Sequence, residues 1–171
     1  YYARHEGLRD GVAIAIKDHY KPRFADNALP RNHTGTVVAL ADKLETLVGL
    51  FGIGQLPTGD KDPFALRRHA LGVIRILVEN NLPLELPSVI EAVVPAFGEL
   101  ITNPTEALLT FMSDRLAVSL REQGYSAQEV DAVLALQPKR LGEIPRRLAA
   151  VRAFAALPEA ASLAAANKRV G

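Results

Sequence analysis

The stretch LADKLETLVGLFGIG, residues 40–54, decides the fold of this chain. With the residues just before it, the stretch repeats apolar side chains at the spacing of an α-helix, about 100° per residue. Seven apolar residues share the resulting stripe: Val37, Leu40, Ala41, Leu44, Leu47, Val48 and Phe51. We expect this stripe to be buried in a core, on a helix capped by Thr34 or Thr36. Asp42 points almost opposite to the stripe, so it is either a solvated charge or a residue placed to hold something.

Capping residues and helix breakers predict that the rest of the chain is helical as well. Helix starts are indicated by Asp10, Asp62-Pro63, Pro87, Pro104 and the pair Ser126 and Glu129. The predicted helices span residues 10–20, 62–81, 87–100, 104–123, 126–136 and 143–157, with another from 159 onward. Pro95 should kink one of them, and Gly124 should end another. No stretch alternates apolar and polar residues, so we predict an all-α, multi-helix bundle of at least seven helices without a sheet.

Composition limits the class of protein. The chain has 171 residues, of which 49% are hydrophobic, and this is enough for the core of one domain. It has no cysteine, which excludes disulfides, thiolate zinc sites and a cysteine nucleophile, and fits a reducing cytoplasm. No apolar run reaches the roughly 18 residues of a membrane span. Because the sequence starts at Tyr1-Tyr2 rather than at a methionine, we expect a piece of a longer protein.

Positive charge is concentrated near the end of the chain. Residues 134–171 hold 7 Lys and Arg against 2 Asp and Glu, whereas residues 1–133 hold 13 against 17. Such an asymmetry indicates either a surface that meets phosphates or helices that pair with acidic neighbours. The candidates for phosphate contact in this region are Lys139, Arg140, Arg146, Arg147 and Arg152. Few aromatic residues accompany them, so they suit the backbone of a duplex better than single-stranded bases.

Two further cations and three histidines are of residue types that can form a binding site. Arg67 and Arg68 follow a predicted helix start, where the helix dipole does not favour cations. They therefore indicate either a phosphate or carboxylate partner, or a salt bridge to Asp60 or Asp62. His19, His33 and His69 lack the spacing of a metal site and are expected to be surface or packing residues.

Several blocks of the sequence resemble one family along nearly the whole chain. The blocks are YYARHEG, PRFADNALP, ALADKLETLVGLFGIG, PTGDKDPFALRRHALGVIRIL and LAAANKRV. They resemble the β subunit of the bacterial heterotetrameric glycyl-tRNA synthetase. The resemblance implies an HD-like helical domain over residues 1–157. It also implies that residues 158–171 start a helix leading to a C-terminal anticodon-binding domain.

The same resemblance implies a degenerate HD-like site. HD hydrolases gather a metal ion with a His-Asp pair, an earlier histidine and a later aspartate. His5-Glu6 stands where the pair is usual, Asp42 stands at the later aspartate, and the earlier ligand would precede Tyr1. Because Glu6 is one methylene longer than aspartate, we expect no metal, and we expect Asp42 to tie helices together by hydrogen bonds. The alternative is a metal-dependent HD-type phosphohydrolase domain.

The resemblance also implies partners and cofactors. The whole enzyme would join glycine to tRNA(Gly) with ATP and magnesium, in a heterotetramer with an α subunit that holds the adenylate-forming site. This chain would contribute to tRNA binding and assembly without catalytic activity and without a cofactor of its own. We expect it to be cytoplasmic, with no membrane partner.

Overall fold

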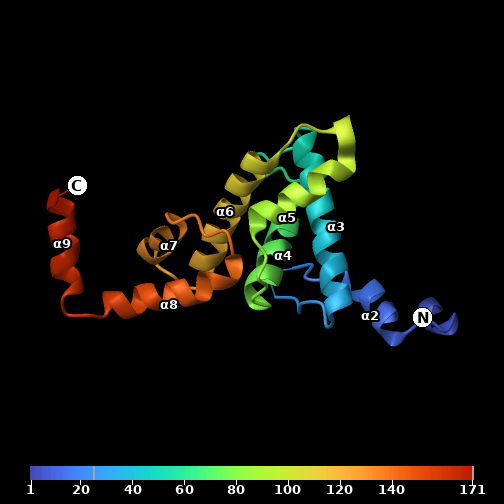
Figure 1. The fold of residues 1–171 in the computed structure, drawn as a ribbon, viewed down its shortest axis with the longest axis horizontal. Helices are drawn as coiled ribbons and strands as arrows, with labels where there is room; N and C mark the ends of the chain where they lie inside the picture. Colours follow the sequence, from blue (N-terminus) through green and yellow to red (C-terminus); the bar gives the residue numbers. More distant parts are fainter. Residues whose placement is uncertain (25, 171) are drawn as a thin grey trace.

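The computed structural model describes residues 1–24 and 26–170, and its regular elements in that part of the chain are all helices (Figure 1). The α-helices are α1 Tyr2–His5, α2 Asp10–Asp18, α3 His33–Gly52, α4 Leu66–Glu79, α5 Leu86–Val93, α6 Thr105–Glu122, α7 Ala127–Leu134, α8 Ile144–Ala155 and α9 Ala160–Val170. Two 3₁₀ segments, η1 Val94–Leu100 and η2 Leu141–Glu143, join them. An isolated bridge between Thr58 and Lys61 forms no sheet in the described residues. The all-α prediction is confirmed, whereas the HD-like label stays a prediction.

The helices are arranged around α4. This helix packs against α3 on one side and α6 on another, while α5 contacts both α3 and α6 (Figure 1). Helices α7 and α8 pack against each other, and α7 also contacts α6. The two ends of the chain lie at opposite ends of the molecule, with α1 and α2 at one end and α9 at the other (Figure 1).

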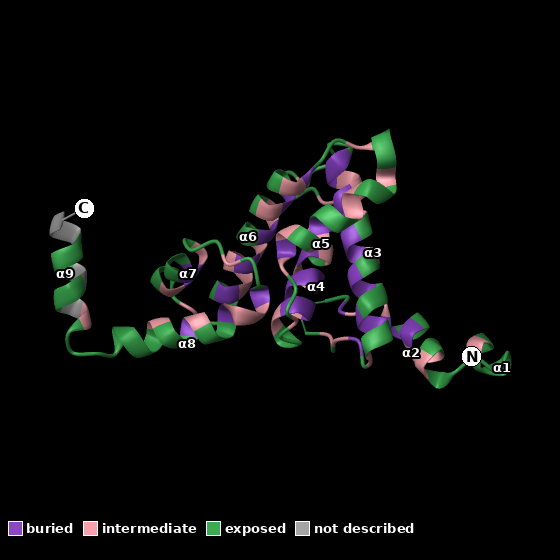
Figure 2. Cartoon of the chain, viewed as in Figure 1, coloured by how far each residue is buried: buried purple, intermediate pink, exposed green. Residues whose placement is uncertain are grey.

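The predicted stripe of α3 is only partly buried (Figure 2). Five of its members are in the core, but Val37 is 65% exposed and Ala41 is exposed as well. Thr36, Ala39 and Lys43 are buried in their place. The reason is that α3 changes neighbours along its length: it packs against α2 as well as against α4, α5 and α6. A single stripe drawn along the whole helix therefore fails in its first turns.

Two predicted helix starts are displaced. Asn32, not Thr34 or Thr36, caps α3, because its side chain accepts a hydrogen bond from the amide of Gly35 at 2.7 Å. Helix α4 begins at Leu66 rather than beside Asp62. The Asp62 carboxylate still accepts hydrogen bonds from the amides of Leu66 and Arg67, at 2.7 and 2.9 Å. It satisfies the free donors of the helix start from a greater distance along the chain.

Asp10 is the first residue of α2 rather than its cap, because Arg9 holds the N-cap position. Three other local signals are confirmed. Pro87 lies in the first turn of α5, and the helical path changes to 3₁₀ just before Pro95. Gly124 follows α6 with a φ of 89°, a conformation that glycine adopts without strain. Ser126 and Glu129 form the predicted capping box at the start of α7.

The segment after α8 bears on the predicted domain division. Helix α8 ends at Ala155, and α9 begins at Ala160 after a turn that contains Pro158. Helix α9 packs against α8 and lies away from the central helices in Figure 1. A boundary at residue 157 would therefore fall in a turn, and the assignment of residues 1–157 and 158–171 to different domains stays a prediction.

Candidate functional site

The three residues of the expected HD-like site do not come together. His5 and Glu6 lie at the end of α1, with side chains 72% and 77% exposed, and face each other at 3.7 Å between Nδ1 and Oε1. Asp42 is half-buried on α3 and lines a cavity to which neither of them contributes. No group of three or more His, Asp or Glu side chains in the described part of the chain is placed to hold a metal ion. These residues do not fit the metal site of an HD hydrolase.

The role expected of Asp42 belongs to Asp18. The backbone carbonyl of Asp42 accepts a hydrogen bond from Thr46 Oγ1 at 3.0 Å, but its carboxylate accepts none from the described residues. The fully buried carboxylate of Asp18 instead accepts three hydrogen bonds from Arg31: from the backbone amide, Nε and Nη2, at 3.0, 2.8 and 3.0 Å. Lys21 Nζ lies 3.1 Å from it. Asp18 therefore ties the end of α2 to the segment that leads into α3.

The electrostatics of Asp18 are those of a paired buried charge. The hydrogen bonds from Arg31 hold the pKa of the Asp18 carboxyl well below its usual range, although burial alone would raise it. One sequence signal could have identified this residue. An aspartate in the last turn of a helix is opposed by the helix dipole, so it needs a cationic partner nearby.

A cavity of about 300 Å³ lies between α3, α4 and the loop after α2. Arg23, Lys43 and Arg68 contribute cations to its lining, Asp42 contributes one carboxylate, and His69 an imidazole. Lys43 is only 3% exposed, and burial lowers the pKa of its ammonium group. The sequence pattern did not predict Lys43 as a site residue, because a lysine on an amphipathic helix is ordinarily solvated. Arg68 is the sequence candidate that the structure places at this cavity.

Arg67 has a structural contact instead. Its Nη2 donates a hydrogen bond to the carbonyl of Gly59, so the side chain fastens the loop that precedes α4. The salt bridge to Asp60 or Asp62 that the sequence left open does not form among the described residues. The contact between Asp62 and Arg67 is to the backbone amide of Arg67.

The basic residues of the last helices are largely paired. Arg140 lies 3.5 Å from Glu85, Arg147 lies 2.9 Å from Glu143, and Arg152 bonds to Glu129. The hydrogen bond from Arg152 lowers the pKa of Glu129 to about 2, and the bond from Arg147 lowers the pKa of Glu143. Arg146 is exposed, with no carboxylate at salt-bridge distance in the described chain. These ion pairs favour the structural alternative for Arg140, Arg147 and Arg152, although their side chains are still 37–52% exposed.

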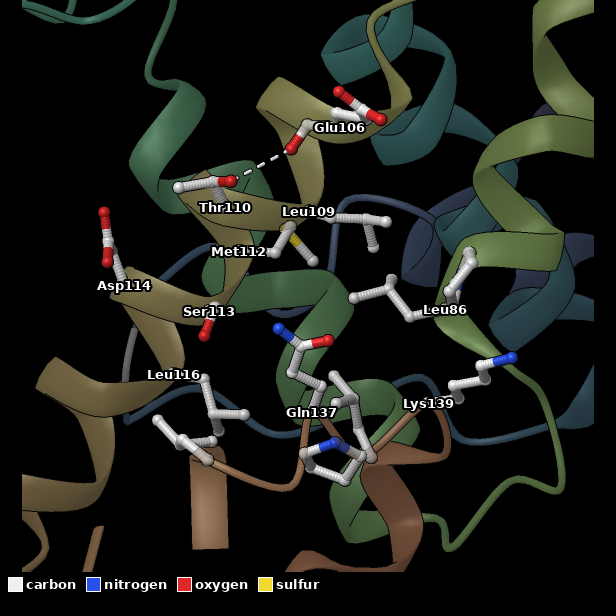
Figure 3. A pocket seen from close by; sticks show the side chains of 14 residues that line it. Leu86, Glu106, Leu109, Thr110, Met112, Ser113, Asp114, Leu116, Gln137 and Lys139 are labelled. Carbon is white, nitrogen blue, oxygen red and sulfur yellow. Dashed lines mark hydrogen bonds between the residues drawn. The ribbon is translucent and has the colours of Figure 1, made fainter. Parts of the chain in front are cut away.

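A larger cavity of about 710 Å³ is bordered by the start of α5, by α6 and by the segment that follows α7 (Figure 3). Leu86, Leu109 and Met112 line its apolar part. Lys139, the fifth basic candidate, lies at this cavity together with the carboxylates of Glu106 and Asp114. Since acids outnumber bases in this lining, the larger cavity does not favour an anion.

Residues 1–135 match the family model described as "Glycyl-tRNA synthetase beta subunit". The chain belongs to this family. The resemblance found in the sequence blocks is thereby confirmed. Members of the glycyl-tRNA synthetase beta subunit family account for all the relatives described below.

The relatives extend over the whole chain. The glycine–tRNA ligase beta subunit of Leptothrix cholodnii is 83% identical over 171 residues, which is all of this chain and 24% of that protein. The corresponding subunit of Polaromonas naphthalenivorans is 70% identical over the same length, again 24% of that protein. The chain thus spans about a quarter of the length of the curated relatives it matches. None of the helices described for this family member is both long and apolar enough to cross a membrane.

Proposed function

We propose that this chain is part of a glycine–tRNA ligase β subunit and serves tRNA binding and assembly rather than chemistry. Membership of the glycyl-tRNA synthetase beta subunit family over residues 1–135 supports the proposal. The intact enzyme would attach glycine to tRNA(Gly) using ATP and magnesium, in the cytoplasm. Its α subunit, in a heterotetramer, would be the protein partner.

The observation that supports a tRNA role is the group of basic residues within positions 139–152, which we call the basic surface although α8 turns its three arginines to different sides. Its members are Lys139, Arg140, Arg146, Arg147 and Arg152. These residues lie on α8 and just before η2, and their side chains reach solvent even where they are ion-paired. Guanidinium groups contact phosphates without reading bases, so the basic surface would position tRNA by its backbone. Phe154 is the aromatic residue in this segment, and one ring offers little for stacking on several bases.

A double substitution tests this role. In the intact enzyme, Arg146→Ala with Arg147→Ala should weaken tRNA binding and flatten its dependence on salt. Each lost phosphate contact should reduce the slope of log affinity against log salt by roughly 0.7–0.9. The tRNA preferred by the enzyme should not change, because backbone contacts carry no sequence information. A binding titration at several salt concentrations measures both quantities.

The matched control removes two exposed cations elsewhere, with Arg9→Ala and Lys17→Ala on or beside α2. This control changes net charge equally and should leave the salt slope unchanged. If the Arg146 and Arg147 variant lowers the melting temperature but keeps the parent slope, the arginines serve only to hold Glu143 and its neighbours. The tRNA role of the basic surface would then be wrong.

A further inference from the structure

The smaller cavity contains a buried cation, Lys43, which donates one hydrogen bond to the described residues although it has three donors. Lys43 Nζ donates a hydrogen bond to the carbonyl of His19 at 3.2 Å. No carboxylate in the described residues lies within salt-bridge distance of it, and its own neighbour Asp42 acts on it only through the longer-range field. An ammonium group has three donors, and a buried charge is costly unless it is paired. Lys43 therefore has donors available for a negatively charged ligand.

A glycine on α4 provides the space that the Lys43 side chain occupies. Gly72, in the middle of α4, is buried against the lysine stem. A Cβ at this position would lie 2.7 Å from Lys43 Cε and 2.9 Å from Cδ, both closer than carbon atoms approach in proteins. Glycine inside a helix costs about 0.5–1 kcal/mol relative to alanine. Gly72 therefore leaves space for the lysine stem, which a larger residue would displace.

A second group in the cavity also lacks a partner. His69 Nδ1 is buried and has no hydrogen-bond partner among the described residues. Burial first, and the nearby Lys43 second, lower the pKa of His69, so the neutral ring is favoured near pH 7. His69 therefore contributes an uncharged ring to the lining, and its buried Nδ1 is not accessible from the cavity.

Two arginines at the cavity are held by aromatic rings. The Arg68 guanidinium lies 5.1 Å from the centre of the Phe24 ring, and that of Arg23 lies 5.9 Å from the centre of the Tyr20 ring. Such contacts orient guanidinium groups without neutralising them. With Lys43 they give three cations against the single carboxylate of Asp42. The lining therefore favours a ligand with more than one negative charge.

We propose that this cavity binds a phosphate group, with Lys43 and Arg68 as its donors. A phosphate presents several strong acceptor oxygens and, as a monoester, close to two charges at pH 7. A volume of about 300 Å³ is at the lower end of the range for ligand pockets, so the ligand is a nucleotide-sized molecule or the terminal nucleotide of an RNA. This site goes beyond the proposed function, because its residues are not part of the basic surface.

Phosphate binding by the intact enzyme tests the proposal. Inorganic phosphate and AMP are titrated and followed by phosphorus NMR, at constant ionic strength, in the parent and in Lys43→Met. Methionine keeps the apolar stem and removes the charge, and removing an unpaired buried cation should not unfold the protein. Lys43→Met should lower the affinity for inorganic phosphate by about tenfold or more, as expected for the loss of one charge-assisted contact. Arg68→Gln, an exposed position on α4, should also weaken binding.

Two further variants separate binding from a general effect of charge. Lys17→Met removes an exposed lysine of α2 and should leave the affinity unchanged. Asp42→Asn removes the single carboxylate of the cavity and should strengthen binding, which is opposite in sign to Lys43→Met. If both Lys43→Met and Arg68→Gln retain the parent affinity, or if Asp42→Asn weakens binding as much as Lys43→Met, the phosphate site is wrong.

The source of the phosphate is decided by a third comparison. The same enzymes are titrated with tRNA carrying either a 5′-phosphate or a 5′-hydroxyl end. If Lys43→Met weakens only the phosphorylated tRNA, the ligand is an RNA terminus. If it weakens inorganic phosphate and AMP alone, the ligand is a free phosphorylated molecule. Neither result depends on the salt slope of the Arg146 and Arg147 variant, so the two proposals fail or succeed separately.

Discussion

Replacing Leu47 by alanine should lower the free energy of unfolding by about 2–5 kcal/mol, the range for removing a large aliphatic side chain from a packed core. Leu47 is fully buried in the middle of α3, within a core that includes residues of α4, α5 and α6. The lost side chain would leave a cavity in this core, and packed helices collapse into such a space only partly. Urea denaturation of parent and variant, followed by circular dichroism, measures the difference.

Val37→Ala is the matched control for Leu47→Ala. Both residues lie on α3 and belong to the same sequence stripe, but Val37 is exposed and makes little use of its apolar surface. Its substitution should change stability by no more than about 0.5 kcal/mol. Equal losses in the two variants would mean that the Val37 end of α3 is buried by something other than the described residues.

The comparison of Leu47 with Val37 shows how far periodicity predicts this fold. The stripe predicts α3 and the buried residues of its second half correctly, because there the helix faces the common core. In its first turns the helix meets α2 and the loop before it, and these neighbours come from a different part of the chain. Periodicity contains no information on which neighbour covers which turn. The capping box of α7 is predicted correctly, since Ser126 and Glu129 satisfy each other within four residues, whereas the predicted caps of α3 and α4 are displaced.

The sequence predicted the candidate sites less well than it predicted the fold. Helical position and a family resemblance both indicated Asp42, whereas the adjacent Lys43 is the buried charge. Its burial depends on Gly72, which lies 29 positions away on another helix, so no local pattern contains it. The basic surface was predicted as a cluster in the sequence, but its pairing with Glu85 and Glu129 depends on tertiary contacts. Residue type and spacing predicted Arg68 and the basic surface, whereas the buried Lys43 was identified only from the structure.

Asp18→Asn should lower the free energy of unfolding by about 3 kcal/mol, the lower end of the range for removing one partner of a buried ion pair. The lower end applies because Arg31 and Lys21 are partly exposed and regain some hydration when the carboxylate is lost. Asparagine fits the space, but its amide group would point donors at the donors of Arg31. The control is Asp10→Asn, at the other end of α2. It removes an exposed ion pair with Arg4 of α1 and should have no measurable effect on stability.

The effect of Asp18→Asn should depend on pH in a defined direction. Because the pKa of Asp18 is lower in the folded than in the unfolded chain, its contribution to stability is present above the unfolded value and lost as pH falls through the folded value. The difference between parent and variant should therefore be constant above about pH 5 and shrink below about pH 4, the ordinary range of an aspartate. Urea midpoints of both proteins from pH 7 to pH 3 measure this. A difference that stays constant to pH 3 would assign the loss to packing at the end of α2 rather than to the charge of Asp18.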